Sequence, residues 1–252
     1  MDVGEALAIL VAGISAGGIN AVVGSGTLFT FPVLLALGYP PITATISNTI
    51  GLAPGSLTGA FGYRSELRGQ GGRLLRLAVM SFVGAVTGGI LLLTLPPGVF
   101  ERVVPVFIGM ACALIMVQPR LTAWLRRRGP AGAGRGRLLP LGVYAAGTYG
   151  GYFAAAQGII LLSLLGTALD EDMQRINALK VALTFVVNAT AAVFYITFAA
   201  PAWPVVALIA AGSIVGGYVG ARLGRRLKPF ALRAVIVAVG LTAAVQLVLR
   251  NI

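Results

Sequence analysis

Long apolar runs fill most of this chain, and two of them, residues 6–37 and 138–169, are interrupted in the same way. The first run is broken at 24–26 (Gly-Ser-Gly) and the second at 156–158 (Ala-Gln-Gly). Each run is too long for one simple membrane helix, which needs roughly 20 apolar residues. A break frees backbone N–H groups, and within lipid these groups must find partners in a protected or wet cavity. Paired breaks in equivalent places of two halves therefore indicate a binding site in the membrane.

Composition restricts the chain to the membrane. Of its 252 residues 58% are hydrophobic and only 10% are charged, and the mean hydropathy is +0.93. These values exclude an ordinary soluble domain. Residues 1–5 lack a basic region, so we expect no cleaved signal peptide. Strands that alternate polar and apolar residues are absent from the sequence, which argues against a β-barrel.

The charged and reactive residues exclude several classes of function. The net charge is +12, but the arginines collect in loops beside apolar segments, which is the positive-inside pattern and not a nucleic-acid footprint. Cys112 is the only cysteine and the chain has no histidine, so a disulfide, a cysteine cluster and imidazole chemistry are excluded. No Ser-His pair, metal cluster or complete phosphate loop is present. We therefore expect no enzymatic activity, no metal site and no tightly bound cofactor.

The two halves of the chain match when the sequence is shifted against itself by 132 positions. The order of the matches and their constant offset indicate an internal duplication, although each glycine match alone means little. The duplication predicts a first membrane repeat over 1–117, a basic cytoplasmic linker over 118–137 and a second membrane repeat over 138–252. The matched pairs are Gly18 and Gly150, Gly26 and Gly158, Thr58 and Thr190, Tyr63 and Tyr195, Ser81 and Ser213, Gly84 and Gly216, Gly88 and Gly220, and Pro97 and Pro229.

The arginines indicate how the segments cross the membrane. If all eight segments cross once, the basic cluster that begins at Arg222 falls outside the cell; if each broken run returns to its own face, all three large clusters become cytoplasmic. We therefore expect an all-α polytopic membrane protein whose halves each contain one broken or re-entrant helical hairpin and three transmembrane helices. Such halves are inverted repeats. A parallel repeat of eight spans stays open, and accessibility labelling at Ala199 and Arg226 would separate the two. The segments are 6–37, 41–63, 74–95, 100–117, 138–169, 173–199, 205–221 and 230–249.

The short helices that follow the two breaks form the candidate binding site. Helix N-termini carry unpaired N–H groups and partial positive charge, so they attract anions. Two such ends meeting near the midplane would form an anion cradle, with Ser25 and Gln157 as side-chain donors. The alternative is that the glycines only let helices pack closely. The expected substrate-binding residues are Gly24, Ser25, Gly26, Thr27, Asn48, Gln157, Gly158, Asn177 and Lys180.

Lys180 lies about two turns inside its span, where an ionisable group is costly and usually faces a cavity. Its counterpart at the 132-residue offset is Asn48, and Asn177 lies one turn away on the same helix face. The alternative is that the flexible Lys180 side chain reaches the membrane interface.

All seven carboxylates lie at the ends of spans or in loops, which favours a negative ligand and leaves the substrate or Lys180 to carry any coupled proton. They are Asp2, Glu5, Glu66, Glu101, Asp170, Glu171 and Asp172.

Four stretches in order resemble the sulfite exporter TauE/SafE family, and the resemblance covers nearly the whole chain. Residues 17–34 read Gly-Gly-Ile-Asn-Ala-Val-Val-Gly-Ser-Gly-Thr-Leu-Phe-Thr-Phe-Pro-Val-Leu, and 40–48 read Pro-Pro-Ile-Thr-Ala-Thr-Ile-Ser-Asn, followed by Tyr63 and Arg64. The second half contributes 147–158 and 177–180 (Asn-Ala-Leu-Lys). The resemblance implies an inner-membrane permease for sulfur oxyanions or organosulfonates, such as sulfite or sulfoacetate, with proton linkage.

The residues and the resemblance together predict a multi-pass secondary transporter of small anions in the cell inner membrane, working by alternating access around the two breaks. Its partners would be a small anionic substrate and the lipid bilayer, and glycine faces such as Gly84, Gly88 and Gly89 are compatible with a homodimer or with internal packing. Two alternatives stay open. An anion channel would share the electropositive tips, and a non-transporting membrane scaffold would need only helix packing.

Overall fold

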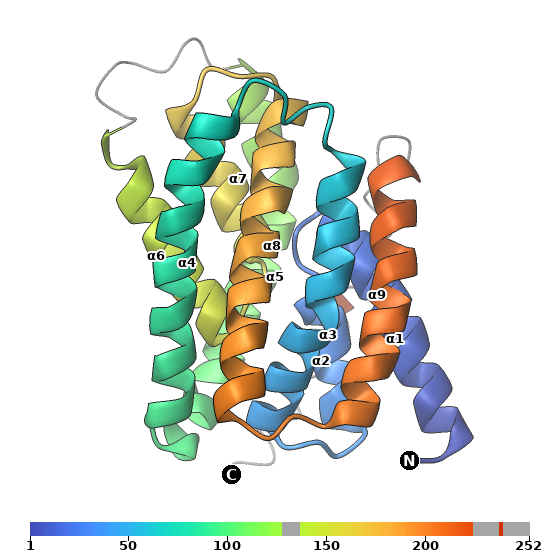
Figure 1. Ribbon diagram of the computed structural model, residues 1–252. Helices are drawn as coiled ribbons and strands as arrows, with labels where there is room; N and C mark the ends of the chain where they lie inside the picture. Colours follow the sequence, from blue (N-terminus) through green and yellow to red (C-terminus); the bar gives the residue numbers. More distant parts are fainter. Residues whose placement is uncertain (128–136, 224–236, 239–252) are drawn as a thin grey trace.

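The computed structural model describes residues 1–127, 137–223 and 237–238, and within these every regular element is an α-helix (Figure 1). Five of the described helices, α1, α4, α5, α8 and α9, are long and apolar enough to cross a membrane, as expected of a multi-pass membrane protein. The helices are α1 Val3–Val22, α2 Thr27–Ala36, α3 Pro41–Gly62, α4 Gly71–Thr94, α5 Pro97–Arg127, α6 Leu139–Tyr152, α7 Gln157–Ala168, α8 Met173–Phe198 and α9 Trp203–Leu223.

The two broken runs each resolve into two helices. The first becomes α1 and α2, with residues 23–26 between them, and the second becomes α6 and α7, with residues 153–156 between them. The short helices α2 and α7 have 10 and 12 residues, about half the length needed to span a bilayer. The sequence therefore predicted the existence of both breaks, although the second lies about three residues earlier than expected.

Two helices differ from the expected segments. α5 continues to Arg127, so the first ten residues assigned to the linker are helical. α3 has 22 residues but is less apolar than the five candidate spans, because its buried face carries polar side chains such as Ser47, Asn48 and Thr49. The expected segment 230–249 lies outside the described residues, apart from residues 237–238.

Corresponding helices of the two halves run in opposite directions in Figure 1. α3 rises from the end where the N-terminus lies, whereas α8 descends towards that end; α4 descends and α9 rises. α1 begins at the N-terminal end, and α6 begins at the other. α1 packs along α9, and α6 packs along α4. The first helix of each broken run therefore packs along a long helix from the other half of the sequence.

Glycines allow these two helix pairs to pack backbone against backbone. A Cβ on Gly216 would collide with the carbonyl oxygen of Ile14, and a Cβ on Gly84 would collide with that of Tyr144. Gly216 lies 132 positions after Gly84, and Tyr144 lies 130 positions after Ile14. The α1–α9 and α4–α6 crossings thus use corresponding residues.

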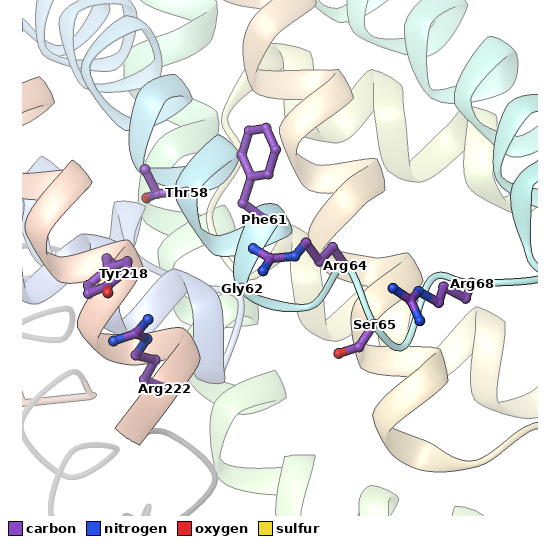
Figure 2. A pocket seen from close by; sticks show the side chains of 8 residues that line it. All are labelled: Thr58, Phe61, Gly62, Arg64, Ser65, Arg68, Tyr218 and Arg222. Carbon is purple, nitrogen blue, oxygen red and sulfur yellow. The ribbon is translucent and has the colours of Figure 1, made fainter.

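Arginines gather at the end of the bundle where α3 and α9 finish. Arg64 and Arg68 follow α3, and together with Arg222 of α9 they line one cavity (Figure 2).

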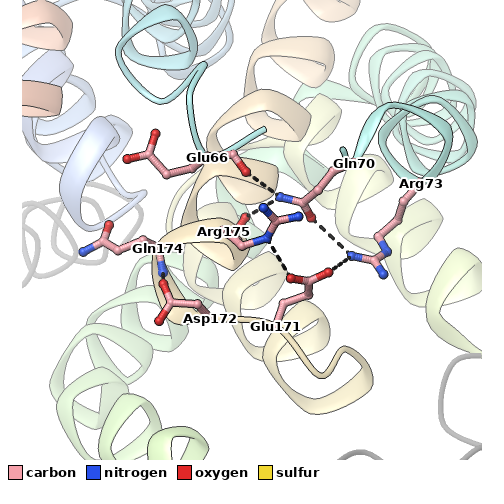
Figure 3. Close-up of polar contacts among 7 residues, drawn as sticks. All are labelled: Glu66, Gln70, Arg73, Glu171, Asp172, Gln174 and Arg175. Carbon is pink, nitrogen blue, oxygen red and sulfur yellow. Dashed lines mark hydrogen bonds and ion pairs between the residues drawn. The ribbon is translucent and has the colours of Figure 1, made fainter. Parts of the chain in front are cut away.

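Glu171 at the same end accepts hydrogen bonds from Arg73 of α4, at 2.8 Å, and from Arg175 of α8, at 2.7 Å (Figure 3). The hydrogen bond from Arg73 is the main reason that the pKa of Glu171 lies below its usual value. These contacts join the loop after α7 to α4 and α8.

Aromatic rings pack behind the second break. The ring of Phe153, in that break, lies 5.2 Å from the ring of Phe31 on α2 and 6.1 Å from that of Phe100 on α5, centroid to centroid. Both contacts have the edge-to-face geometry that aromatic pairs prefer. α5 also reaches the first break, where the Gln118 side-chain amide donates to the carbonyl oxygen of Val23 at 3.4 Å. This helix therefore supports both breaks from one side.

Candidate functional site

The first break is a tight turn between α1 and α2. Gly24 has φ +85°, a left-handed conformation that glycine adopts without steric cost, and its N–H donates to the Ile19 carbonyl at 3.0 Å. α2 begins at Thr27, after Gly26. The N–H of Phe29 donates to the carbonyl of Gly26 at 2.9 Å, so part of the first turn of α2 is satisfied locally.

The second break has the same hydrogen-bond pattern with alanine in place of glycine. Ala154 has φ +66° and Ala156 has φ +58°, and the Ala154 N–H donates to the Tyr149 carbonyl at 3.2 Å. The side-chain hydroxyl of Tyr149 also contacts this break, because it donates to the Ala155 carbonyl at 2.6 Å. Left-handed φ costs an L-residue roughly 1–2 kcal/mol. The surrounding contacts must therefore hold this turn in place.

The two breaks touch each other. The N–H of Gly158, in the first turn of α7, donates to the carbonyl oxygen of Gly24 at 3.0 Å. A Cβ built on Gly24 would lie 2.6 Å from the Cα of Gly158, so only glycine fits on this side of the contact. Residues 134 positions apart thus meet backbone to backbone. The expectation of free N–H groups at the start of α7 is wrong for this conformation, because the N–H groups of residues 157–160 are all hydrogen-bonded, that of Gly158 to the other break.

The backbone geometry of the two breaks changes the sequence alignment between them. Corresponding turns are 130 positions apart, because Gly24 matches Ala154 in φ and in its hydrogen bond, and Thr27 and Gln157 both begin short helices. The helices after the breaks keep the offset of 132, as Pro41 of α3 and Met173 of α8 show. The difference arises because α7 is two residues longer than α2. Gly26 and Gly158 are therefore not counterparts.

Thr27 and Asn48 come together as a buried pair. The Asn48 amide donates to the Thr27 hydroxyl at 3.2 Å, and the Asn48 carbonyl oxygen accepts from the Thr30 hydroxyl. All three side chains are buried. Thr30 was not among the expected site residues, although a threonine one turn after Thr27 on the same helix face was a signal for it.

The counterparts of this pair in the second half are Gln157 and Lys180. Gln157 begins α7 as Thr27 begins α2, and Lys180 lies at the α8 position that matches Asn48 on α3. Both side chains are only 1% exposed, and neither the Gln157 amide nor the Lys180 amine has a hydrogen-bond partner among the described residues. The Ser25 hydroxyl in the first break is also buried and without a partner. Buried polar groups are normally satisfied, so these three are candidates for contact with a polar ligand. The same holds for the hydroxyls of Thr45, Ser81 and Thr184 and for the Gln118 side-chain carbonyl oxygen.

Lys180 does not reach the membrane interface in this structure. It is the eighth residue of α8, and its amine nitrogen is fully buried, which contradicts the alternative of a side chain extended to the surface. Asn177, one turn earlier, is half-buried and so lies nearer the surface than Lys180. None of the seven carboxylates of the chain, all of which are described, is buried. Burial disfavours the charged form of an amine that has no carboxylate beside it, and an anionic ligand would stabilise that form.

A second polar cluster joins α1, α3 and α8. The Ser56 hydroxyl accepts from the side-chain amides of Asn20 at 3.1 Å and Asn188 at 2.9 Å. Asn20, Ser56 and Thr184 border a narrow gap too small for a water molecule. Ser56 and Asn188 are 132 positions apart, so counterparts from the two halves meet here. Asn20 and Ser56 were not expected at a site, and their polarity within apolar helices was the only signal.

Comparison with known proteins agrees with this architecture. A family model described as "Sulfite exporter TauE/SafE" matches residues 9–247. A "Probable membrane transporter protein" of Haemophilus influenzae is 25% identical over 228 residues, which are 88% of this chain and 87% of that protein. "Probable membrane transporter protein YfcA" of Escherichia coli K12 is 26% identical over 84% of this chain and 76% of its own length. "Probable membrane transporter protein ORF9" of Sinorhizobium sp is 27% identical over 95% and 90%, respectively. No solved structure gives a significant match.

Proposed function

The chain belongs to the sulfite exporter TauE/SafE family of membrane transporters, and on that premise we propose that it is a secondary transporter of small anions. The contact between Gly24 and Gly158 carries the proposal, because it brings the starts of α2 and α7 to one place inside the helical bundle. Helix starts are suited to anions through their N–H groups and their partial positive charge.

The ligand is held, in this proposal, by the starts of the two short helices and by the side chains around them. Ser25 and Gln157 donate hydrogen bonds to ligand oxygens, and Lys180 supplies the positive charge. Thr27 and Asn48, which are hydrogen-bonded to each other, line the side of the site that comes from the first half. Gly24, Gly26 and Gly158 let the backbone approach closely, and half-buried Asn177 lies on the route to the surface.

The two halves act as inverted repeats in this proposal. Corresponding helices that run in opposite directions, and matched glycine contacts in the α1–α9 and α4–α6 crossings, support this arrangement. Alternating access would follow if α1 moves with α9, and α6 with α4, against the rest of the bundle. The arginine-rich end would then face the cytoplasm of a cell whose inner membrane holds the protein.

Sulfur oxyanions and organosulfonates, such as sulfite and sulfoacetate, are the proposed substrates. The family description names sulfite. The oxygens of these anions are arranged in a pyramid or tetrahedron around sulfur, so they can accept from several N–H and hydroxyl donors at once. No buried carboxylate is available to carry a proton. Proton coupling would therefore use the substrate or the Lys180 amine.

A thermal-shift panel on the purified protein tests the proposal. Sulfite, sulfate, sulfoacetate and taurine are compared by the intrinsic fluorescence of Trp124 and Trp203, because sulfite would react with thiol dyes. A ligand at 100 times its Kd adds about 2.7 kcal/mol of stability. At roughly 2–4 °C per kcal/mol, this raises the melting temperature by about 5–10 °C. Sulfite or sulfoacetate should give this shift, and zwitterionic taurine should not.

Variants and flux measurements make the test specific. Lys180→Met, which keeps length and apolar volume, should fold but lose the shift, whereas Arg102→Gln, an exposed charge at the start of α5, should keep it. In proteoliposomes, a carrier takes up sulfite faster when the lumen holds the same anion. Uptake without such trans-stimulation would indicate a channel, and neither flux nor shift for any anion would leave only the scaffold alternative.

A further inference from the structure

A cavity of about 420 Å³ opens at the arginine-rich end, between the end of α3 and the end of α9 (Figure 2). Three arginines line it: Arg64 and Arg68 from the loop after α3, and Arg222 from the last turn of α9. Phe61 and Tyr218 complete its apolar part. The cavity lies between the two halves and away from the contact between the breaks.

The cavity has an excess of positive charge, with three arginines in its lining and the Glu66 carboxylate beside it. Within 1–127 and 137–223, none of its three arginines forms an ion pair. The Arg222 guanidinium stacks over the Tyr218 ring, 4.3 Å from its centroid, which fixes its position. The neighbouring carboxylate, Glu66, accepts a hydrogen bond from the Ser65 hydroxyl. Exposed guanidinium groups arranged around one space suit a phosphate, which accepts paired N–H bonds.

The cavity also borders an exposed apolar surface. Phe61 is 59% exposed, and next to it along the same helices lie the exposed side chains of Leu57, Ile214 and Val215. The Thr58 hydroxyl donates to the Ile214 carbonyl at 3.3 Å, so α3 and α9 touch where this apolar surface begins. Apolar side chains that give way to arginines and a tyrosine within one turn or two mark the level of lipid headgroups. A soluble anion needs no such apolar border.

We propose that this cavity binds the phosphate headgroup of an anionic phospholipid, with the acyl chains lying along the exposed apolar faces of α3 and α9. Arg64, Arg68 and Arg222 hold the phosphate, and Tyr218 positions Arg222. Because α3 belongs to the first half and α9 to the second, the lipid bridges the halves. The inference does not depend on which anion is transported.

Lipid binding to the full-length protein in detergent tests the inference. Native mass spectrometry counts bound lipid as dioleoylphosphatidylglycerol or dioleoylphosphatidylcholine is added. A basic residue near a lipid surface contributes about fivefold in affinity, so Arg64→Gln with Arg222→Gln should weaken phosphatidylglycerol binding about 25-fold. The matched control is Arg120→Gln with Arg127→Gln, which removes two exposed arginines of α5 outside the cavity and should change binding less than twofold.

Three results distinguish a lipid site in this cavity from a general charge effect and from a site for a soluble anion. Selective binding of phosphatidylglycerol that is lost only in the cavity variant supports the inference. Equal loss in both double variants would mean a general charge effect, and inorganic phosphate that displaces the lipid from wild type at millimolar concentration would assign the cavity to a soluble anion; either result overturns it. Arg64→Lys with Arg222→Lys, which keeps the charge, should retain at least a fifth of the affinity and shows that the cavity variant fails through charge and not misfolding.

Discussion

Replacing Gly24 with alanine tests the contact between the two breaks. The new Cβ would meet two separate costs. Left-handed φ costs an L-residue roughly 1–2 kcal/mol. The Cβ would also lie 2.6 Å from the Cα of Gly158, which forces the breaks apart at a cost of roughly 1–3 kcal/mol for overpacking. The N–H···O bond from Gly158 to Gly24 would lengthen, and about 1 kcal/mol more would be lost.

Gly38→Ala is the matched control for this variant. Gly38 has the same φ, +85°, but a Cβ there would have no neighbour within 4 Å, so the control measures the backbone cost alone. Cys112, the single cysteine and only 1% exposed, reports unfolding through its reaction with a thiol-activated dye. At roughly 2–4 °C per kcal/mol, Gly38→Ala should lower the apparent melting temperature by about 2–8 °C and Gly24→Ala by at least twice as much. Equal decreases in the two variants would refute the contact.

Three further variants test the surrounding structure by the same assay. Ser56→Ala leaves the Asn188 amide without its acceptor, so we expect a loss of about 1–3 kcal/mol, which Ser56→Thr should partly restore. Phe153→Ala removes the ring at the centre of the aromatic cluster and should cost about 3–5 kcal/mol; no loss would mean that the cluster does not support the break. Because the hydrogen bond from Arg73 holds the folded pKa of Glu171 below its ordinary 4.5, the Glu171 carboxylate stabilises above that value and loses its effect as the pH falls through the folded pKa. Glu171→Gln should therefore be less stable than wild type at pH 7 and equal to it in strong acid.

The first break could be read from the sequence because glycine marks the residue that needs left-handed φ. Gly24 does have φ +85°. The second break was misplaced for the same reason, since its left-handed residues are Ala154 and Ala156, and the nearby Gly158 lies inside α7. Gly158 is instead glycine because the other break approaches it, which only the folded chain reveals.

The depth of Lys180 followed from counting residues along its helix, but its partners did not. Spacing along one helix predicts neighbours on the same face, whereas the meeting of Ser56 with Asn188 depends on how α3 and α8 pack. α5 is also longer than expected, because a change from apolar to basic residues does not by itself end a helix. α5 continues to Arg127 with Leu125 buried beside Gly166 of α7, a contact between helices that the sequence does not display.

Because α7 is two residues longer than α2, the two breaks do not meet midway between the ends of the bundle. At 1.5 Å per residue, α7 is about 3 Å longer than α2, so the meeting point of the breaks lies farther from the arginine-rich end than from the N-terminal end. If the proposed anion site lies at this meeting point, an anion released towards the arginines would cross a larger share of the transmembrane voltage than one released the other way. Each elementary charge moved through the full field involves about 2.3 kcal/mol per 100 mV, so membrane potential would then act more strongly on one half of the proposed transport cycle.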